Sequence, residues 1–305
     1  MDQSFTESLR TEPQRIILPI LVLYNMRLSH SATYQTFVAS SCHGGLDQNF
    51  IAVYDNGPTP QVNPAEESHL FAYKHDPDNS GIAAAYNWAL EIAHSHGFLW
   101  LLLLDQDTRL PPPFLASLLG LADLHATNQS VAAIVPYVTD KGAMISPRRV
   151  CFARLGPLPE PSPAVAESEV TAINSGAAIK VSFVRSLGGF NLAYRLDCLD
   201  HWLFRQLYAR GKRVAISGSV LEHKLSVSDY RNQVSLTRYR SILSAEALFV
   251  TTEKRRPEIP MYVIRLMLRA VKQLVVYRRP ELAALTCAMI PASVARLARS
   301  LLRRR

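Results

Sequence analysis

Short apolar runs alternate with longer helix-like segments through the first half of this 305-residue chain, and that alternation limits the possible folds most strongly. The strand-like runs are Leu18–Tyr24, Phe50–Asp55, His69–Lys74, Phe98–Leu104 and Val131–Val138. Helix-like segments lie between several of them, such as 82–97, which stops at Gly97, and 114–126, which follows three prolines. Strands that alternate with helices predict a doubly wound α/β fold, with a mainly parallel sheet covered by helices on both faces.

Polar side chains follow four of these runs, at the point where each run ends. Asn25 follows the first run, and Asp55 with Asn56 ends the second. Residues 75–79 follow the third, and residues 105–107 follow the fourth. Ligands of open parallel sheets bind outside the carboxyl ends of the strands. We therefore expect a binding site where these polar residues meet.

The fourth run, Phe98–Leu104, stops directly at Asp105, Gln106 and Asp107. Two acids after a buried strand are costly unless a positive group lies between them. Carboxylates at this spacing can share Mg²⁺ or Mn²⁺, which needs few protein ligands when substrate phosphates supply the others. The alternative is a pair of solvated loop acids. The strand-end position favours a divalent metal that carries a diphosphate.

Composition excludes several classes of protein. Hydrophobic residues make up 48% of the chain and charged residues 19%, so a folded core is expected. The four cysteines form no CxxC pair, which argues against a zinc finger and fits a reducing cytoplasm. The first fifteen residues are polar and predict no signal peptide, and the apolar runs are too short to predict a transmembrane span.

The net charge of +8 is concentrated near the end of the chain. Residues 254–305 contain 13 Lys and Arg against two acids, a net charge of +11, so the remainder carries −3. A nucleic-acid-binding protein would show cations interleaved with aromatics over its main domain. That pattern is absent, so we expect no nucleic-acid partner.

Seven motifs occur in an order that resembles a known family. They are VYDNG (53–57), NSGIAAAYNWAL (79–90), LLLLDQDT (101–108), NSGAAIK (174–180), LGGFN (187–191), LDCLDHWLFRQLYARGKRV (196–214) and LEHKLS (221–226). Together they resemble family-two inverting glycosyltransferases with the GT-A fold, in particular the rhamnosyltransferase-like members that build bacterial O-antigen and other surface polysaccharides. The resemblance covers about residues 18–226. It implies transfer of a sugar, such as rhamnose from dTDP-rhamnose, to a glycan or polyprenyl-linked acceptor.

The resemblance and the strand-end pattern together assign expected roles. The residues expected to bind the nucleotide sugar are Asn25, Asp55, Asn79, Gly81, Asn87, Asp105, Gln106 and Asp107. The metal, Mg²⁺ or Mn²⁺, would be held chiefly by Asp107, with Asp105 and His223. The acceptor side would include Asn174, Ser175, Gly176 and Trp202, although packing in the core is the alternative for Trp202.

Inversion requires a carboxylate that takes the proton from the acceptor hydroxyl. The resemblance implies Asp200 for this base, with Asp197 as the second candidate. Relatives usually show D-x-x-D-x-E-W, whereas this chain has DCLDHW, one residue shorter, so both acids remain candidates. His201 is a further candidate base, and its alternative is a packing or surface residue. An alternative for Asp200 is an N-cap of the following helix.

We expect a glycosyltransferase domain over residues 1–225 and a helical, basic region over 226–305. Arg265, Arg269 and Lys272 recur at helical spacing there, as do Arg296, Arg299 and Arg303. Cationic stripes on apolar helices suit an anionic membrane surface, which predicts a cytoplasmic protein at the inner face of the cell membrane. Packing on the catalytic domain or a homo-oligomer contact is the alternative.

Three other functions are alternatives to this interpretation. An inactive, membrane-associated scaffold would not need the acids at 105, 107 and 200. A sugar-phosphate nucleotidyltransferase should carry a glycine-rich loop after its first strand, and residues 23–31 contain no glycine. An NAD-dependent dehydrogenase should carry GxGxxG at the same place, which is also missing.

Overall fold

The computed structural model describes residues 16–41, 50–64, 67–152, 154–158, 163–223, 234–253 and 258–302, with side chains up to residue 291. The strands are β1 (Ile17–Leu23), β2 (Ile51–Asp55), β3 (Leu70–His75), β4 (Trp100–Asp105), β5 (Thr108–Arg109), β6 (Val131–Asp140), β7 (Ala143–Ser146), β8 (Arg148–Cys151), β9 (Arg154–Gly156), β10 (Ala164–Val165), β11 (Val170–Thr171), β12 (Ala177–Lys180) and β13 (Arg213–His223). The helices are η1 (Leu28–His30), α1 (Ala32–Ser41), α2 (Ile82–Ser95), α3 (Phe114–Leu124), α4 (Val181–Ser186), α5 (Leu199–Ala209), α6 (Leu236–Thr252), α7 (Glu258–Val275) and α8 (Pro280–Leu302).

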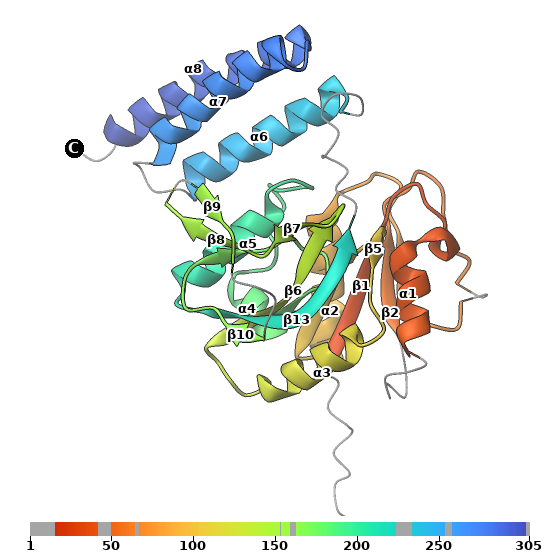
Figure 1. Cartoon of the computed structure of the whole chain (residues 1–305). Helices are drawn as coiled ribbons and strands as arrows, with labels where there is room; N and C mark the ends of the chain where they lie inside the picture. The colour runs from red at the N-terminus through yellow and green to blue at the C-terminus, as the bar shows by residue number, and fades with distance from the viewer. Residues whose placement is uncertain are drawn as a thin grey trace, which may run out of the picture.

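A large mixed sheet forms the centre of the molecule (Figure 1). Its strand order is β10-β13-β6-β12-β4-β1-β2-β3, with β5 paired to β13 and β7 paired to β6. Strands β4, β1, β2 and β3 run parallel, and so do β6 and β13. β12 runs antiparallel between β4 and β6. The predicted mainly parallel α/β sheet is confirmed, and the reversed strand within it is an addition that the sequence did not predict.

The uninterrupted apolar run of β4 follows from burial on both faces. Leu101 and Leu103 pack into the core on the face covered by α2, α4 and α5. Trp100, Leu102 and Leu104 pack into the core on the face covered by α1 and α3. Because side chains alternate across a strand, a strand covered on both sides must be apolar at every position.

The long segment 139–171 was expected to be an irregular excursion with a hairpin near 148–156. The hairpin is confirmed, since β8 pairs antiparallel with β9. The expectation that the rest of the segment is irregular was wrong in part, because it contains three more short strands. β7 pairs with β6, β10 pairs with β13, and β11 pairs with β8. Such two- to four-residue strands carry too little hydrophobic alternation to be recognised from sequence.

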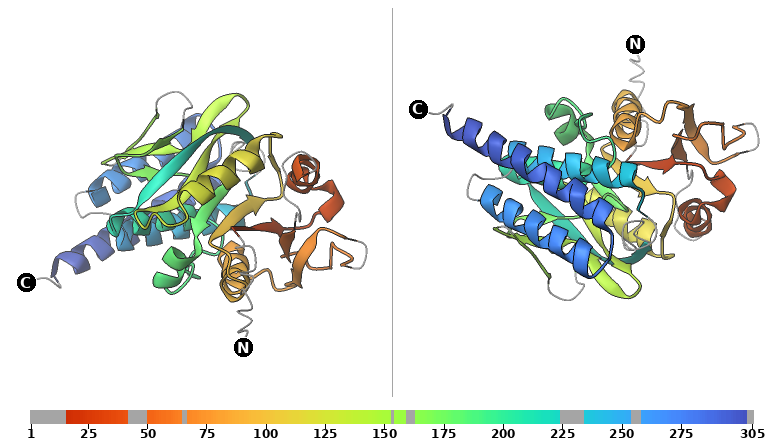
Figure 2. Two further views of the ribbon diagram at one scale, coloured as in Figure 1. Left: turned by 90° about the horizontal axis from the view of Figure 1, so that it is seen from below. Right: turned by 90° about the horizontal axis from the view of Figure 1, so that it is seen from above.

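Three helices, α6, α7 and α8, form a separate layer, seen from above in Figure 2. They share a small core that includes Tyr239, Tyr262, Leu266 and Leu282. Leu248 and Phe249 of α6 also pack against the core of the sheet domain, so the layer rests on that domain. The helical C-terminal region is therefore confirmed. The expected boundary at residue 225 falls in 224–233, outside the described residues, as do the side chains of Arg296, Arg299 and Arg303.

In the described part of the chain, no helix has the length and apolar character that a membrane crossing requires.

Candidate active site

The carboxyl ends of the parallel strands bring the predicted polar residues to one edge of the sheet. In the strand register, Asp105 lies beside Val22 of β1, and Asp55 lies beside Leu23. His75 lies beside Asp55 in turn. The strand ends that carry Asp55, His75 and Asp105 therefore lie side by side, as expected.

The start of α1 holds the loop that contains Gln106. Thr33 Oγ1 lies in hydrogen-bond range of the carbonyl oxygens of Asp105 and Thr108, and the Thr108 amide donates to Thr33 Oγ1 at 2.9 Å. The backbone amide of Tyr24 donates to Gln106 Oε1, and the Ser31 hydroxyl donates to the Gln106 carbonyl, both at 2.8 Å. Gln106 thus fixes the position of the two acids that flank it.

The two flanking carboxylates have different partners. Asp105 accepts a hydrogen bond from the Ser175 hydroxyl. Asp107 Oδ1 lies 3.4 Å from His223 Nδ1, because β13 pairs with β5 and places His223 opposite Thr108. The same ring nitrogen lies 2.9 Å from Thr108 Oγ1. The structure therefore brings His223 to the acidic loop across more than a hundred residues of sequence.

The described residues contain no preformed cluster of three metal-binding side chains. A divalent ion that takes most of its ligands from substrate phosphates does not need one. The side chain of Asp107 is 38% exposed, so its oxygens are accessible, and the neighbouring Asp105 adds a second hard oxygen donor. This donor set fits Mg²⁺ or Mn²⁺ bound together with a diphosphate.

Asp55 is fully buried and its carboxylate is occupied by the protein. Oδ1 accepts from the Gly57 amide at 2.9 Å, and Oδ2 accepts from the Gln61 amide at 2.6 Å and the Tyr73 hydroxyl at 3.1 Å. Asp55 therefore shapes the loop after β2. Its expected contact with the nucleotide stays a prediction.

The loop between β3 and α2 is organised by Asp76, which the sequence analysis did not single out. Its carboxylate accepts from the Tyr54 hydroxyl at 2.8 Å and the Ser80 amide at 2.9 Å. Burial alone would raise the pKa of Asp76, but these hydrogen bonds outweigh it and hold the pKa below the usual value. In the same loop Asn79 has a φ of 48°. The fixed carboxylate supports this left-handed turn.

Gly81 lets the segment before α5 approach the start of α2. Its φ is 96°, and an added Cβ would lie 2.2 Å from the carbonyl oxygen of Arg195. That oxygen accepts a hydrogen bond from the Ile82 amide at 2.7 Å, and the Arg195 guanidinium donates to the Asn79 carbonyl at 2.5 Å. Glycine is needed here for both conformation and space. Arg195, which the sequence did not single out, thereby connects the segment that leads to Asp197 and Asp200 with the loop between β3 and α2.

Asn87 acts within the protein. Its side-chain amide donates to the Phe190 carbonyl at 2.8 Å, and its Oδ1 accepts from the Phe190 amide at 2.7 Å. A Cβ at Gly189 would lie 2.6 Å from the same Oδ1, so the motif LGGFN is fitted to this asparagine. Asn87 thus positions the chain that leads to α5, and nucleotide binding by this residue stays a prediction.

The two candidate bases differ in their surroundings. Asp197 forms a two-point ion pair with Arg238 of α6, in which Nη2 lies 2.7 Å from Oδ1. Asp200 lies in the first turn of α5 and accepts only from the His201 amide, at 2.7 Å, among the described residues. The N-cap interpretation of Asp200 is wrong, because Cys198 occupies the N-cap position. His201 hydrogen-bonds Thr171 at 3.1 Å, as a packing residue would.

Tyr86 of α2 is a buried polar residue that the sequence did not single out. Its side chain is fully buried on α2, and its hydroxyl has no hydrogen-bond partner among the described residues. Burial raises the pKa of Tyr86 well above 10.0, and the negative charges of Asp105 and Asp200 raise it further. Asp105 and Asp200 thus both contribute to the electrostatic environment of this buried hydroxyl. A tyrosine in an apolar stretch gives no sequence signal for such a position.

The expected acceptor-side residues lie at the start of β12. Ser175 holds Asp105, and the Asn174 side-chain oxygen is buried without a partner among the described residues. Gly176 has a φ of 80°, and a Cβ there would lie 2.6 Å from Leu221. Trp202 is buried in the core, as its packing alternative predicts. Asn174 is thus a residue whose orphaned polar group would be satisfied by a ligand.

Comparison with solved structures gives low-identity matches, and the first of those described here supports the fold. TarS residues 1–349 from S. aureus in complex with UDP matches at TM-score 0.50 and 14% identity, over 95% of this chain and 92% of that chain. Full TarS matches at TM-score 0.49 and 13% identity, over 81% of this chain, which spans only 47% of TarS. The mannosyltransferase PcManGT from Pyrobaculum calidifontis in complex with GDP-Man and Mn²⁺ matches at TM-score 0.48 and 15% identity, over 96% and 84%.

No curated protein sequence matches this chain significantly. A family model described as Glycosyl transferase family 2 matches residues 31–188, slightly more than half of the chain. This range contains the acidic loop at 105–107 and the β12 start, and it ends before the two candidate bases. The sheet topology with helices on both faces is that of a GT-A-like fold. The chain therefore belongs to glycosyl transferase family 2.

Proposed function

We propose that this protein is an inverting glycosyltransferase that transfers a sugar from a nucleotide sugar to a glycan or lipid-linked acceptor. The observation that carries the proposal is the acidic loop at the carboxyl edge of the sheet, which lies within the residues matched by the family model. There the Asp107 carboxylate lies 3.4 Å from His223 Nδ1, and Asp105 accepts a hydrogen bond from the Ser175 hydroxyl. Rhamnose from dTDP-rhamnose, for O-antigen or another bacterial surface polysaccharide, is the proposed donor and pathway.

Asp200 is the proposed base. Arg238 already compensates the charge of Asp197, so proton uptake by Asp197 would break an ion pair. Asp200 has no cationic partner among the described residues, so proton uptake there breaks no ion pair. In the reaction, Asp200 would accept the proton of the acceptor hydroxyl as that oxygen attacks the anomeric carbon.

Asp107, Asp105 and His223 would hold the divalent metal. When bound, such an ion supplies a Lewis acid that neutralises the charge of the leaving nucleotide diphosphate. Gln106 fixes the two acids through its contacts with Tyr24 and Ser31. The buried Asn174 oxygen is the group on this chain proposed to accept a hydrogen bond from the acceptor.

A peripheral position at the cytoplasmic face of the membrane is also proposed, and α7 supports it. Six large apolar side chains on one face of α7 are exposed: Ile264, Met267, Leu268, Val271, Leu274 and Val275. Their spacing of three and four residues forms a continuous stripe. Exposed cations at Arg265 and Lys272 lie beside this stripe. An amphipathic helix with cations next to its apolar face suits an anionic bilayer.

The proposal is tested by incubating the full chain with a panel of nucleotide sugars and either Mg²⁺ or Mn²⁺, and measuring release of the nucleotide diphosphate. We expect release with one donor, loss of release with EDTA, and a strong decrease in Asp107→Asn. Nucleotide binding without release from any donor, in the presence of acceptor extracts, would instead indicate an inactive member of the family.

A further inference from the structure

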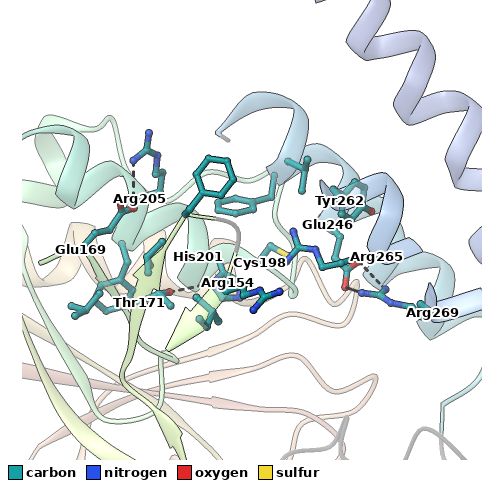
Figure 3. Close-up of a pocket in the computed structure, with 17 residues that line it drawn as sticks. Arg154, Glu169, Thr171, Cys198, His201, Arg205, Glu246, Tyr262, Arg265 and Arg269 are labelled. Atoms are coloured by element: carbon teal, nitrogen blue, oxygen red, sulfur yellow. Dashed lines mark hydrogen bonds and ion pairs between the residues drawn. The ribbon is translucent and has the colours of Figure 1, made fainter. Parts of the chain in front are cut away.

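A cavity lies beside α5, the helix that carries Asp200 (Figure 3). It has a volume of about 240 Å³ and is enclosed by the β8–β9 hairpin, α5, α6 and α7. That volume corresponds to roughly eight water molecules at the density of the liquid. It can therefore hold one end of a ligand, with the rest of the molecule outside.

The cavity is distinct from the strand-end site. Cys198, His201 and Arg205 of the α5 region line it, whereas Asp200, Asp105 and Asp107 do not. One short helix thus separates the two sites. A molecule that binds in the cavity would lie within a few residues of the candidate base without occupying the donor site.

The lining combines apolar walls with an excess of positive charge. Phe152, Leu155, Phe249 and Val250 are among its apolar residues. The charged residues that line it are Arg154, Arg205, Arg265 and Arg269, against Glu169 and Glu246. A cavity with four guanidinium groups and two carboxylates attracts an anion, and its apolar walls favour an anion attached to hydrocarbon.

Ion pairs account for two of the four arginines. Arg205 lies 3.4 Å from Glu169, and Arg269 makes two contacts with Glu246 at 2.9 and 3.2 Å. Arg154 forms no ion pair with any described residue. Arg265 enters from α7, on the other side of the cavity from the hairpin (Figure 3). Arginines thus enter the cavity from the hairpin wall and from the α7 wall.

Arg265 also links the cavity to the exposed apolar stripe of α7. At 100° per residue, Arg265 projects next to Leu268, at the border of the stripe, and it both lines the cavity and reaches solvent. A hydrocarbon chain that lies against the stripe could place its terminal anionic group at the cavity, passing Arg265 at the border.

We infer that this cavity binds the phosphate of a long-chain lipid phosphate whose hydrocarbon lies along the α7 stripe, and that this lipid carries the acceptor. The inference rests on the proposed function for the acceptor role. The cavity walls come from the hairpin, α5, α6 and α7, so they would contact a bound lipid phosphate on several sides and favour it over a bulk phospholipid headgroup or a free phosphate.

The experiment measures binding of the full chain to neutral phosphatidylcholine vesicles that contain either a polyprenyl phosphate or phosphatidylglycerol at equal charge. We expect the protein to prefer the polyprenyl phosphate, with inorganic pyrophosphate competing only weakly. Arg154→Gln should weaken binding to the polyprenyl phosphate about tenfold, the loss of one charge-assisted hydrogen bond, and should change binding to phosphatidylglycerol little. Lys272→Gln removes an exposed charge of α7 outside the cavity and should affect both vesicles alike.

Equal effects of Arg154→Gln and Lys272→Gln on both vesicles would overturn the inference, as would complete displacement by pyrophosphate. Labelling of the unaltered protein with a photoreactive polyprenyl phosphate provides an independent readout, and labels outside the cavity lining and the α7 stripe would also overturn it. Binding of nucleotide diphosphates is measured in parallel by calorimetry. Selective lipid binding without nucleotide binding would support the cavity and refute the proposed function. Nucleotide binding without lipid preference would refute the cavity assignment alone.

Discussion

Asp197 and Arg238 form an ion pair that ties the loop before α5 to the first turn of α6. The pair joins the sheet domain to the helical layer and compensates the charge of one of the two candidate bases. The contact gives Asp197 a structural partner, and the proposed chemical role of Asp200 has a separate experimental signature.

We expect Asp200→Asn to lower sugar transfer by at least a hundredfold with little change in stability or donor binding, since a general base contributes about that much. Asp197→Asn should instead lower the free energy of unfolding by about 1–3 kcal/mol, because it leaves a charged hydrogen bond unmade. Transfer assays and urea denaturation measure the two effects.

Arg238→Gln is the matched control. It should destabilise the protein as much as Asp197→Asn, and the double variant should be no less stable than either single one. If Asp200→Asn were active and Asp197→Asn stable but inactive, the roles would be exchanged.

Tyr86→Phe tests the link between the acidic loop and the base. Removing a buried hydroxyl that has no partner in the described structure should leave the free energy of unfolding unchanged or raise it. We expect transfer to fall about tenfold nonetheless, as for loss of one hydrogen bond to a substrate. Full activity in a stable Tyr86→Phe protein would show that the hydroxyl serves neither substrate nor carboxylate.

Gly81→Ala should be far more harmful than Gly97→Ala, although both glycines have positive φ. A Cβ at Gly97 meets no atom within 4 Å, so only the backbone conformation is strained, at a cost of about 1–2 kcal/mol. At Gly81 the Cβ also collides with the Arg195 backbone, which must move. Thermal unfolding should therefore rank the variants, and only Gly81→Ala should weaken donor binding. Similar melting temperatures would contradict the close approach.

Charge placed on the α7 stripe should prevent membrane binding. Leu268 is 65% exposed, and Leu268→Asp should reduce sedimentation with anionic vesicles strongly, because aspartate cannot enter the interface. Leu124 of α3 is 70% exposed on the sheet domain, so Leu124→Asp is a control with the same change of charge. Equal losses in both variants would mean that overall charge, and not the stripe, governs binding. A Leu268→Asp monomer made from a dimeric protein would identify a second copy as the partner.

The pH dependence of thiol labelling should separate Cys198 from the exposed cysteines. Burial, together with the charges of Asp200, Glu246 and Asp197, raises the pKa of Cys198 well above its usual value of 9.0. A raised pKa keeps the thiol protonated, and alkylation requires the thiolate. We expect iodoacetamide to label Cys151 and Cys287 near pH 9 while Cys198 stays unlabelled, as measured by peptide mass spectrometry. Asp200→Asn should shift Cys198 labelling to lower pH.

The strand-end logic predicted the edge of the sheet correctly because it depends only on hydrophobic runs and on the direction of parallel strands. It could not distinguish side chains that bind a ligand from side chains that form hydrogen bonds within the protein. Asp55, Asn87 and Gln106 have the residue types of ligands, but their oxygens are used by nearby backbone amides. These bonds depend on loop conformations that no spacing rule encodes.

The residues that sequence reasoning missed share one property, which is that tertiary contacts alone give them significance. Tyr86 lies on an apolar helix face that the sequence predicts as core. Arg195 accepts a hydrogen bond from the Ile82 amide through its backbone carbonyl, which any residue type could do. Arg238, which pairs with Asp197, lies 41 residues from it in a different layer. The cavity behind α5 likewise requires the packing of α6 and α7 on the hairpin.

The reversed direction of β12 has a further consequence. β12 runs antiparallel to β4 and β6, so it begins at the edge of the sheet where β4 and β6 end. The residues just before it, Asn174 and Ser175, therefore lie at the same edge as the acidic loop. The turn before Asn174 can consequently lengthen, or Asn174 can vary, while Ser175 keeps its hydrogen bond to Asp105 and the strands that present the acids stay unchanged. If this turn meets the acceptor as proposed, mutagenesis there should change acceptor preference and leave donor binding intact.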